Sequence, residues 1–516
     1  MVRNRFTASL AVLTLLFSLT LQSRAVKLFR APVTYNTGGS GADSLALADV
    51  NGDGKLDMVV ANPCDVVHDC NGLVGVLLGN GDGTFQPVKT YLTGGLVASA
   101  VAVADVNGDG KPDLLVANEC TPSDNCHDFI SSVGVLLGNG NGTFQPAQTF
   151  LTDGQQARAI AVADVNADHK PDLIVLNRFA TLWNPTGSVA VLAGNGDGTF
   201  QSPVLTSGVG NDPRGMALGD ANGDGKVDVF LPYACLSPSC GNGTGVWVFL
   251  GNGDGTFQAA HGYDSGSADS ASSIATADLN GDSKLDLLVS TTCLNQCAQA
   301  AIAVFLGLGD GTFQGPQRYA LVGPSGDAIA AADIDRDGKS DLLVVGCPAG
   351  KTCGRGIVNL LRGNGDGTFQ AAQTFATGGR SPGSIVVADV NGDFKPDLLI
   401  ANAYANGQTS GPGEIGVLFG TTRFPSATSV TSNPNPSVQG QAVTFTATVK
   451  SNGWIAPTGS VAFKNGTAGI GTAKLVGGVA TLTRSNLPVG HLTITAIYSG
   501  DAQNAQSVAV IIQVVN

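Results

Sequence analysis

Short apolar segments alternate with polar, glycine-rich turns through most of the chain, and the same order returns every 55–59 residues. In the first repeat this pattern predicts strands at Ser44–Ala48, Leu56–Asn62, Leu73–Leu78 and Thr84–Tyr91, called A, B, C and D below. The turn Gly79–Gly83 between C and D has the Asn/Asp-Gly pairs of a hairpin. A period of this length with short strands predicts a propeller or a solenoid.

The two ends of the repeat array favour a closed propeller. The seventh repeat ends after its strand C, Ile415–Gly420, and has no strand D of its own. The segment Phe29–Tyr35 has the pattern of Phe85–Tyr91, a strand D. We therefore expect the N-terminal segment to complete the last blade and cover its open edge. The sequence predicts a seven-bladed β-propeller closed by an N-terminal strand over residues 26–424.

A second all-β domain is predicted after the repeats stop, near Ser426. Alternating runs occur at 442–449, 460–464, 479–484, 492–498 and 508–514, and this part has no cysteine. Several short strands within about 90 residues are typical of a β-sandwich. The fold class expected for the whole chain is therefore all-β, with the sandwich at 425–516.

The loop between strands A and B carries the most specific chemistry. The loop occurs seven times in all, first at Asp49–Asp57, and every copy has oxygen side chains at positions 1, 3, 5 and 9. Calcium takes six to eight oxygen ligands, and position 7 can add a backbone carbonyl. An EF-hand is excluded because it requires a Glu at position 12. An ordinary turn is the alternative for one copy, but a turn requires one or two such residues rather than four.

We therefore expect up to seven structural calcium ions. Position 6 favours glycine because the bend calls for positive φ, and His169, Ser283 and Phe394 depart from this in the third, fifth and seventh loops. The expected ligands, with each lysine acting through its carbonyl oxygen, are Asp49, Asn51, Asp53, Lys55 and Asp57; Asp105, Asn107, Asp109, Lys111 and Asp113; Asp164, Asn166, Asp168, Lys170 and Asp172; Asp220, Asn222, Asp224, Lys226 and Asp228; Asp278, Asn280, Asp282, Lys284 and Asp286; Asp333, Asp335, Asp337, Lys339 and Asp341; Asp389, Asn391, Asp393, Lys395 and Asp397.

Charge and the N-terminus restrict the partners and the compartment. The formal net charge is −13, and the seven loops hold 22 of the 40 acidic residues, so nucleic acid is not an expected partner. Arg3 and Arg5 precede an apolar run, and Ser23-Arg24-Ala25 offers a cleavage site. This predicts a signal peptide over residues 1–25 and a secreted or surface-associated chain without a membrane span.

Ten cysteines fall into five close pairs, which is typical of disulfides in an exported chain. Pairing within each repeat is the economical interpretation, and zinc is the alternative. The pairs are Cys64/Cys70, Cys120/Cys126, Cys235/Cys240, Cys293/Cys297 and Cys347/Cys353.

The Asp-x-Asp/Asn-x-Asp-Gly-x-x-Asp loop and the Gly-Asp-Gly-Thr-Phe turn resemble those of FG-GAP/VCBS-repeat, integrin α-like propellers. The run Leu487–Asp501 resembles bacterial Ig-like domains. The first resemblance implies calcium in the A–B loops at one rim and a ligand-binding face formed by the B–C and D–A loops at the other. It places every cysteine pair on that second face.

These features together predict a calcium-stabilised binding or adhesion protein, monomeric, whose ligand is a glycan or an extracellular protein. Candidate contacts are Arg158, Arg214 and Arg380 in D–A links, with Trp183, Tyr233 and Tyr404 in B–C loops. No nucleophile-elbow or zinc-protease motif is present. The alternatives are a polysaccharide lyase or hydrolase on the same scaffold, which requires only a few placed acids, and a purely structural surface component.

Overall fold

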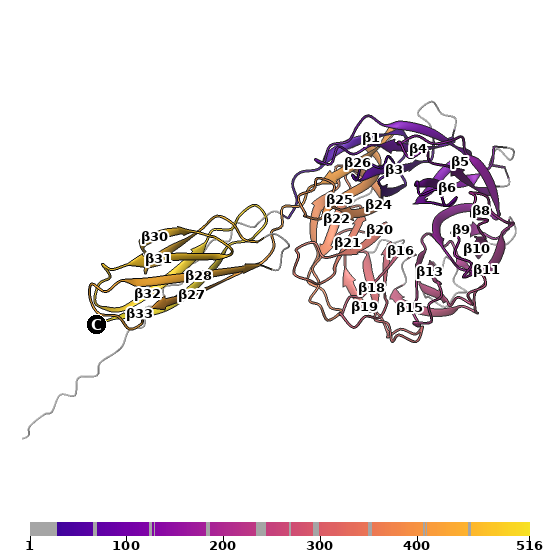
Figure 1. Cartoon of the computed structure of the whole chain (residues 1–516). Coiled ribbons are helices and arrows are strands. Elements are labelled where there is room, and N and C mark those ends of the chain that lie inside the picture. The colour runs from indigo at the N-terminus through magenta and orange to yellow at the C-terminus, as the bar shows by residue number, and fades with distance from the viewer. Residues whose placement is uncertain are drawn as a thin grey trace, which may run out of the picture.

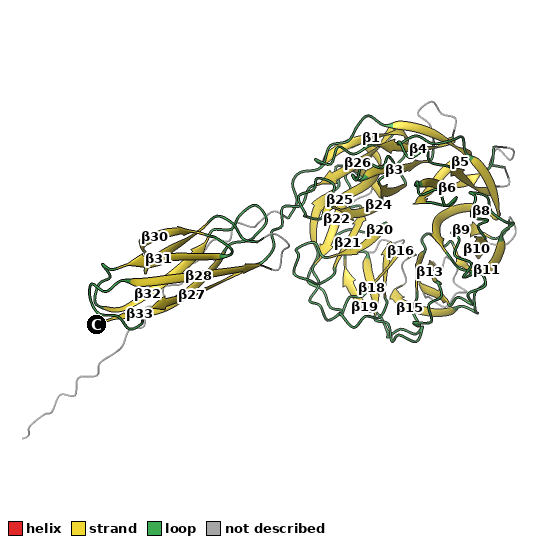
Figure 2. Ribbon diagram, viewed as in Figure 1, coloured by secondary structure: helices red, strands yellow, loops and turns green. Residues whose placement is uncertain are grey.

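The computed structural model describes residues 28–64, 70–122, 126–127, 129–181, 186–233, 244–267, 270–292, 299–348, 353–405, 408, 410–451 and 456–516. Within these ranges all regular structure is β-strand (Figure 2). No helix among the described residues is long and apolar enough to cross a membrane. The predicted all-β class is confirmed, whereas the predicted signal peptide lies outside the described residues.

Residues 28–420 form seven successive four-stranded units, each with strands in the order A, B, C, D. Their strands are β2 (Ser44–Ala48), β3 (Asp57–Asn62), β4 (Asn71–Leu77) and β5 (Lys89–Ala104); the end of β5, β6 (Asp113–Cys120), β7 (Ile130–Leu136) and β8 (Gln148–Ala163); the end of β8, β9 (Asp172–Phe179), β10 (Thr186–Leu192) and β11 (Val204–Asn211); β12 (Ala217–Gly219), β13 (Asp228–Tyr233), β14 (Thr244–Phe249) and β15 (His261–Ser267); β16 (Ser270–Ala277), β17 (Asp286–Thr292), β18 (Ala301–Phe305) and β19 (Gln317–Ala320); β20 (Ala328–Ala332), β21 (Asp341–Gly346), β22 (Ile357–Leu361) and β23 (Gln373–Ala376); β24 (Gly379–Ala388), β25 (Asp397–Ala405), β26 (Pro412–Leu418) and β1 (Val33–Ser40).

Strand D differs from the sequence prediction at both of its ends. In the first unit it begins at Lys89 rather than Thr84, because Phe85 makes an isolated bridge to Gly79 that closes the turn. It then continues without a break into the next strand A, so the predicted glycine-rich link is part of β5. Positive φ at Gly94 and Val97 bends this strand while the pairing with β4 and β6 is kept.

The N-terminal strand pairs with the last strand C, as predicted. β1 runs antiparallel to β26, with Tyr35 opposite Ile415, and Phe29 bridges Gly420. β1 thus occupies the place of strand D in a sheet whose other three strands are some 340 residues away in the sequence (Figure 1). This covers the edge of β26 that its own repeat leaves open.

Each strand B is buried on both faces, and its side chains pack into clusters that two neighbouring units share. In β3, for example, Met58 and Val60 pack with Leu399 and Val417 of the seventh unit, whereas Val59 packs with Leu114 of the second. Five further clusters join the remaining neighbouring units in the same way. Figure 1 shows these units arranged around a common centre, with strands of the first unit beside strands of the last.

Backbone hydrogen bonds between a C–D turn and an A–B loop also join neighbouring units. The amide of Gly83, in the C–D turn of the first unit, donates to the carbonyl of Val390 in the A–B loop of the seventh. Gly142 donates to Val50 in the same way, one unit further on. Equivalent bonds join the third unit to the second, the fourth to the third and the fifth to the fourth.

The C-terminal part folds as two packed sheets, with strand orders β27-β28-β31 and β30-β29-β32-β33. Phe445, Phe463 and Tyr498 lie fully buried between them. The sequence predicted five of the seven strands and missed β27 and β30. The strands are β27 (Ser426–Asn433), β28 (Val443–Ser451), β29 (Ser460–Asn465), β30 (Ala468–Lys474), β31 (Val479–Arg484), β32 (Gly490–Tyr498) and β33 (Ser507–Val515).

Candidate functional site

The seven A–B loops share one backbone conformation. Position 6 has positive φ in every copy, including the three that lack glycine there: His169 at 64°, Ser283 at 63° and Phe394 at 61°. Position 4 is also left-handed in every copy, with Ala167 and Arg336 replacing glycine in the third and sixth loops. The bend that the sequence predicted from glycine is therefore kept where glycine is absent.

The oxygen at position 1 organises each bend. In the first loop Asp49 accepts hydrogen bonds from the amides of Asp53, at 3.1 Å, and Gly54, at 2.7 Å. Both bonds occur in all seven loops, at distances of 2.6–3.2 Å. Asn51, at position 3, accepts a further bond from Asp53. The loops therefore hold their bend by ordinary turn chemistry as well as offering oxygen ligands.

The aspartate at position 9 has a structural role that the sequence prediction missed. Asp57 is fully buried, and its two oxygens accept bonds from the amides of Val50 and Gly79, at 2.9 and 2.7 Å. It thus ties the A–B loop to the C–D turn within one unit. The same pair of bonds is made by Asp113, Asp172, Asp228, Asp286, Asp341 and Asp397.

The electrostatics of the loops suit a divalent cation. Burial raises the pKa of Asp57, and the carboxylates of Asp53 and Asp49 raise it further. The same causes raise the pKa of Asp397 to about 7. Each position-7 lysine offsets part of this repulsion through an ion pair with the position-5 aspartate, at 2.8–3.9 Å. A bound cation would remove the rest.

The sixth loop fits a cation best. Oxygens of Asp333, Asp335 and Asp341 lie within 4.8 Å of one another. One buried oxygen of Asp335 has no hydrogen-bond partner, and burial raises the pKa of Asp341 to about 6. Only this loop carries aspartate rather than asparagine at position 3. Calcium at all seven loops stays a prediction.

Three of the five predicted disulfides are present: Cys64–Cys70, Cys120–Cys126 and Cys347–Cys353. The other two predicted pairs lie outside the described residues. No cysteine in the described part of the chain is free. The zinc alternative is therefore wrong for these three pairs, each of which begins at the end of a strand B or just after it.

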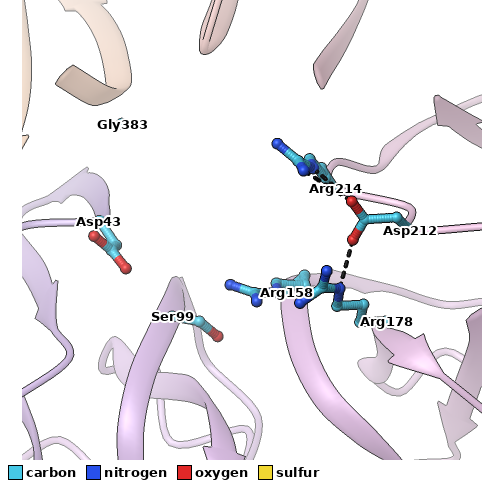
Figure 3. A pocket seen from close by; sticks show the side chains of 7 residues that line it. All are labelled: Asp43, Ser99, Arg158, Arg178, Asp212, Arg214 and Gly383. Atoms are coloured by element: carbon cyan, nitrogen blue, oxygen red, sulfur yellow. Dashed lines mark hydrogen bonds and ion pairs between the residues drawn. The ribbon is translucent and has the colours of Figure 1, made fainter. Parts of the chain in front are cut away.

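A cavity of about 410 Å³ opens at the other end of the inner strands (Figure 3). It is lined by Asp43, Ser99, Arg158, Arg178, Asp212, Arg214 and Gly383. A continuation of about 260 Å³ reaches the first residues of strand A in all seven units, among them Ser44, Met216 and Ile329. Each strand A begins at this cavity and ends at an A–B loop, which is the predicted cation loop of its unit. The cavity and the A–B loops therefore lie on opposite faces.

One wall of the cavity is built from arginines. Asp212 is buried, and it accepts hydrogen bonds from Arg178 at 2.5 Å and from Arg214 at 2.8 Å. Arg158 pairs with Glu119 at 2.8 Å. Figure 3 shows Arg158 and Arg214 extending from this wall toward the centre of the cavity. Three guanidinium groups therefore face two paired carboxylates.

The opposite side carries carboxyl groups. Burial, reinforced by Glu119 and opposed by Arg158, raises the pKa of Asp43 to about 6. Burial likewise raises the pKa of Asp327 to about 6, against a hydrogen bond from Ser325 and the charge of Arg214. An arginine of the facing wall therefore lowers each pKa against the effect of burial: Arg158 acts on Asp43 and Arg214 on Asp327.

The sequence named some of these residues but did not bring them together. Arg158 and Arg214 were candidates and line the cavity, whereas Arg380 donates to the carbonyls of Cys353 and Gln408. Tyr233 packs against Trp247, at 5.1 Å between ring centroids. Tyr404 lies in β25 opposite Arg380, and Trp183 lies outside the described residues.

The cavity could have been predicted from one equivalent position in the seven repeats. The residue six positions before the first aspartate of each cation loop is, in chain order, Asp43, Ser99, Arg158, Arg214, Ser272, Asp327 and Gly383. Five of the seven line the cavity. A comparison of repeats that looks for what they share passes over this position, because its chemistry changes from unit to unit.

The chain belongs to the FG-GAP-like repeat family. The family model matches residues 49–116, 125–175, 179–231, 236–289, 294–344 and 349–400, and these six segments contain all seven cation loops. A bacterial Ig-like domain of group 3 matches residues 430–516. The predicted membership in both families is confirmed. FG-GAP-like repeats and disulfides together indicate an extracellular protein.

Individual relatives are distant. Human and bovine phosphatidylinositol-glycan-specific phospholipase D are 28% and 30% identical over 155 and 156 residues, which is 27% of this chain and 18% of each relative. The chain thus spans less than a fifth of these relatives. Among solved structures, the extracellular domain of a putative hybrid two-component system from B. thetaiotaomicron gives a TM-score of 0.41 at 10% identity, covering 95% of this chain and 60% of that one. A GH43_1 enzyme from Xanthomonas citri in complex with xylotriose gives 0.28 at 14%, covering 55% and 93%.

Proposed function

We propose that residues 26–424 form a closed seven-bladed β-propeller, stabilised by calcium, that binds an extracellular glycan or protein at the face opposite the cation loops. Residues 425–516 act as an Ig-like spacer, and residues 1–25 direct export. The observation that carries the proposal is the charged cavity at the start of the seven inner strands.

Closure of the propeller is supported by contacts between the first and last units. β1 completes the sheet of β24–β26, a hydrophobic cluster joins β3 to β25, and Gly83 donates to Val390 across the same junction. An open solenoid would leave its first and last units apart. One cavity lined from all seven units also requires a common axis.

A binding role is supported by the kind of cavity. Small-molecule sites occupy roughly 300–1,000 Å³ and place a few polar groups in a rigid frame. The cavity at the start of the inner strands has this volume and holds charged side chains on a framework of paired strands. Disulfides stiffen three of the loops on the same face.

The test is a ligand screen with the full chain in 2 mM calcium, on a glycan array and against extracellular-matrix proteins. Binding that the double variant Arg158→Gln/Arg214→Gln weakens, while the melting temperature is kept, supports the cavity as the site. Binding to neither class of ligand contradicts the proposal.

A carbohydrate-active enzyme is the second candidate, favoured by one observation. Asp43 and Asp327 are carboxyls whose pKa lies near 6, the range in which a carboxyl serves as a general acid. Incubation of bound glycans with the chain, followed by assay for new reducing or unsaturated ends, separates the two candidates. New ends that disappear in Asp43→Asn favour catalysis, and binding without new ends favours recognition alone.

A further inference from the structure

The charges around the central cavity are arranged by side, and we propose that this arrangement binds a hydroxylated organic carboxylate, as at the end of an acidic glycan. The carboxylate lies against Arg158 and Arg214, and a hydroxyl group of the ligand donates to Asp43, which lines the same cavity. This inference rests on the proposed function and specifies the ligand of the same cavity.

The order of residues around the cavity gives the first argument. One register position supplies, unit by unit, aspartate, serine, arginine, arginine, serine, aspartate and glycine. The two arginines come from adjacent units, and the two aspartates flank the unit that carries Gly383. Positive charge is therefore gathered on one side and negative charge on the other.

The arginine wall has binding capacity left over. Arg158 uses one of its five N–H groups on Glu119, and Arg214 uses two on Asp212. Three guanidinium groups against two carboxylates leave one positive charge. The side chains of Arg158 and Arg214 are 32% and 44% exposed, so part of each guanidinium group is accessible to a ligand. Arginine is the residue best suited to hold a planar carboxylate through two parallel bonds.

The opposite side supplies acceptors. Among the described residues, no side chain donates a hydrogen bond to the carboxyl of Asp43, although Figure 3 shows it at the cavity. Asp327 receives one bond, from Ser325. Between these two units Gly383 contributes no side chain, so the cavity is open there. A carboxylate at a partly closed cavity, as Asp43 is, accepts hydrogen bonds from sugar hydroxyls.

The size of the cavity favours the end of a chain over a protein surface. About 410 Å³ accommodates a ligand of one or two sugar rings, at the small end of the range for such sites. The lining carries charged side chains on both sides. Protein anchors, which are mostly aromatic or aliphatic, would leave these charges desolvated and unpaired.

The first experiment uses the unmodified full chain in calcium. Its affinities for glucuronate and galacturonate, as monosaccharides and as short oligomers, are measured by titration calorimetry beside those for glucose, galactose and sodium sulfate. We expect the uronates to bind at least tenfold more tightly than the neutral sugars and sulfate. Tighter oligomer binding identifies a chain end as the natural ligand, and equal binding identifies the free acid. Equal affinity for neutral sugars, or for sulfate, overturns the inference.

The second experiment uses variants. Arg158→Gln and Arg214→Gln each lower uronate affinity at least tenfold, and Asp43→Asn lowers it for uronates but leaves the weak binding of acetate unchanged. Arg318→Gln is the matched control, because Arg318 lies on the outer strand β19 and bonds to the carbonyl of Gly266. Melting temperatures show whether each variant is folded. The first experiment, which compares uronates with neutral sugars, uses the unmodified chain and so does not depend on any variant.

The two proposals fail separately. If the chain binds a neutral glycan or a protein and the cavity variants leave that affinity unchanged, this inference is overturned and the proposed function stands. If no ligand of any class binds, both fall.

Discussion

At the scale of single residues, aspartates of one repeat have three different roles. Asp57 is buried and bonds to two amides. Asp53 is exposed on the loop and pairs with Lys55. Asp82, in the C–D turn, accepts two bonds from Thr84, which lower its pKa. Composition does not separate these roles, but burial does.

We predict that Asp57→Ala destabilises the chain by about 2–4 kcal/mol, because two buried amides lose their acceptor. The loss persists in excess EDTA, since these bonds involve no metal. Asp82→Ala, at an exposed turn, costs less than about 1 kcal/mol. Urea unfolding of both variants, with and without EDTA, measures this. A loss for Asp57→Ala that vanishes in EDTA would show that it acts only through a cation.

Asp43 gives a prediction with a defined pH window. Its pKa is about 6 in the folded chain and about 4 when unfolded, so the folded state binds its proton more tightly. The stability that this group contributes is therefore complete below about pH 4 and is lost as the pH rises through about 6. Asp43→Asn should raise stability at pH 7.5 by about 1 kcal/mol, a value reduced for solvent screening.

The measurement is urea unfolding in calcium at pH 4.5 and 7.5. The two proteins should coincide at pH 4.5 and separate at pH 7.5, with the variant the more stable. A variant that is less stable at pH 7.5 would show that Arg158 outweighs burial at this site.

At the scale of elements, the sequence predicted what every repeat shares and missed what changes between repeats. Strand B was evident because its residues are continuously apolar. In several units the apolar run ends at a buried Asn, such as Asn62 or Asn118. In four units this Asn accepts a bond from a threonine in or just after strand D of the preceding unit, as Thr93 donates to Asn118 at 2.6 Å. Strand D was misplaced because Phe85 has strand character yet closes a turn. β27 was missed because its side chains are half-exposed serine, threonine and small apolar residues.

The N-terminal strand gives the prediction at this scale. A chain that begins at residue 41 lacks β1, so β26 presents an unpaired edge. We expect it to melt several degrees lower and to self-associate, as measured by calorimetry and size-exclusion chromatography. A chain that begins at residue 28 retains β1 and is the control. Equal melting temperatures and monomeric behaviour of both would argue against closure by this strand.

At the scale of the whole molecule, one scaffold serves two faces. Inner strands of five or so residues separate the A–B loops from the cavity, so we expect any coupling between a cation in the loops and a ligand in the cavity to pass through short paired strands. The A–B loops are alike in all units because each has the same structural role. Each loop carries the carbonyl that can accept a bond from the next unit. The cavity residues differ between units, as the proposed ligand would require, because a ligand without sevenfold symmetry meets a different side chain from each unit.

Calcium removal tests the first of these faces. Extracellular sites bind calcium at roughly 10⁻⁴–10⁻³ M, so 10 mM calcium adds about 1.4–2.7 kcal/mol for each occupied loop by mass action. We expect EDTA to lower the melting temperature markedly and titration to give up to seven ions. Asp335→Asn should weaken the sixth site, whose unpaired oxygen it replaces. Asn51, which already stands at the equivalent position of the first loop, shows that the bend tolerates the amide. A melting curve that EDTA leaves unchanged would mean that the turn hydrogen bonds alone hold the loops.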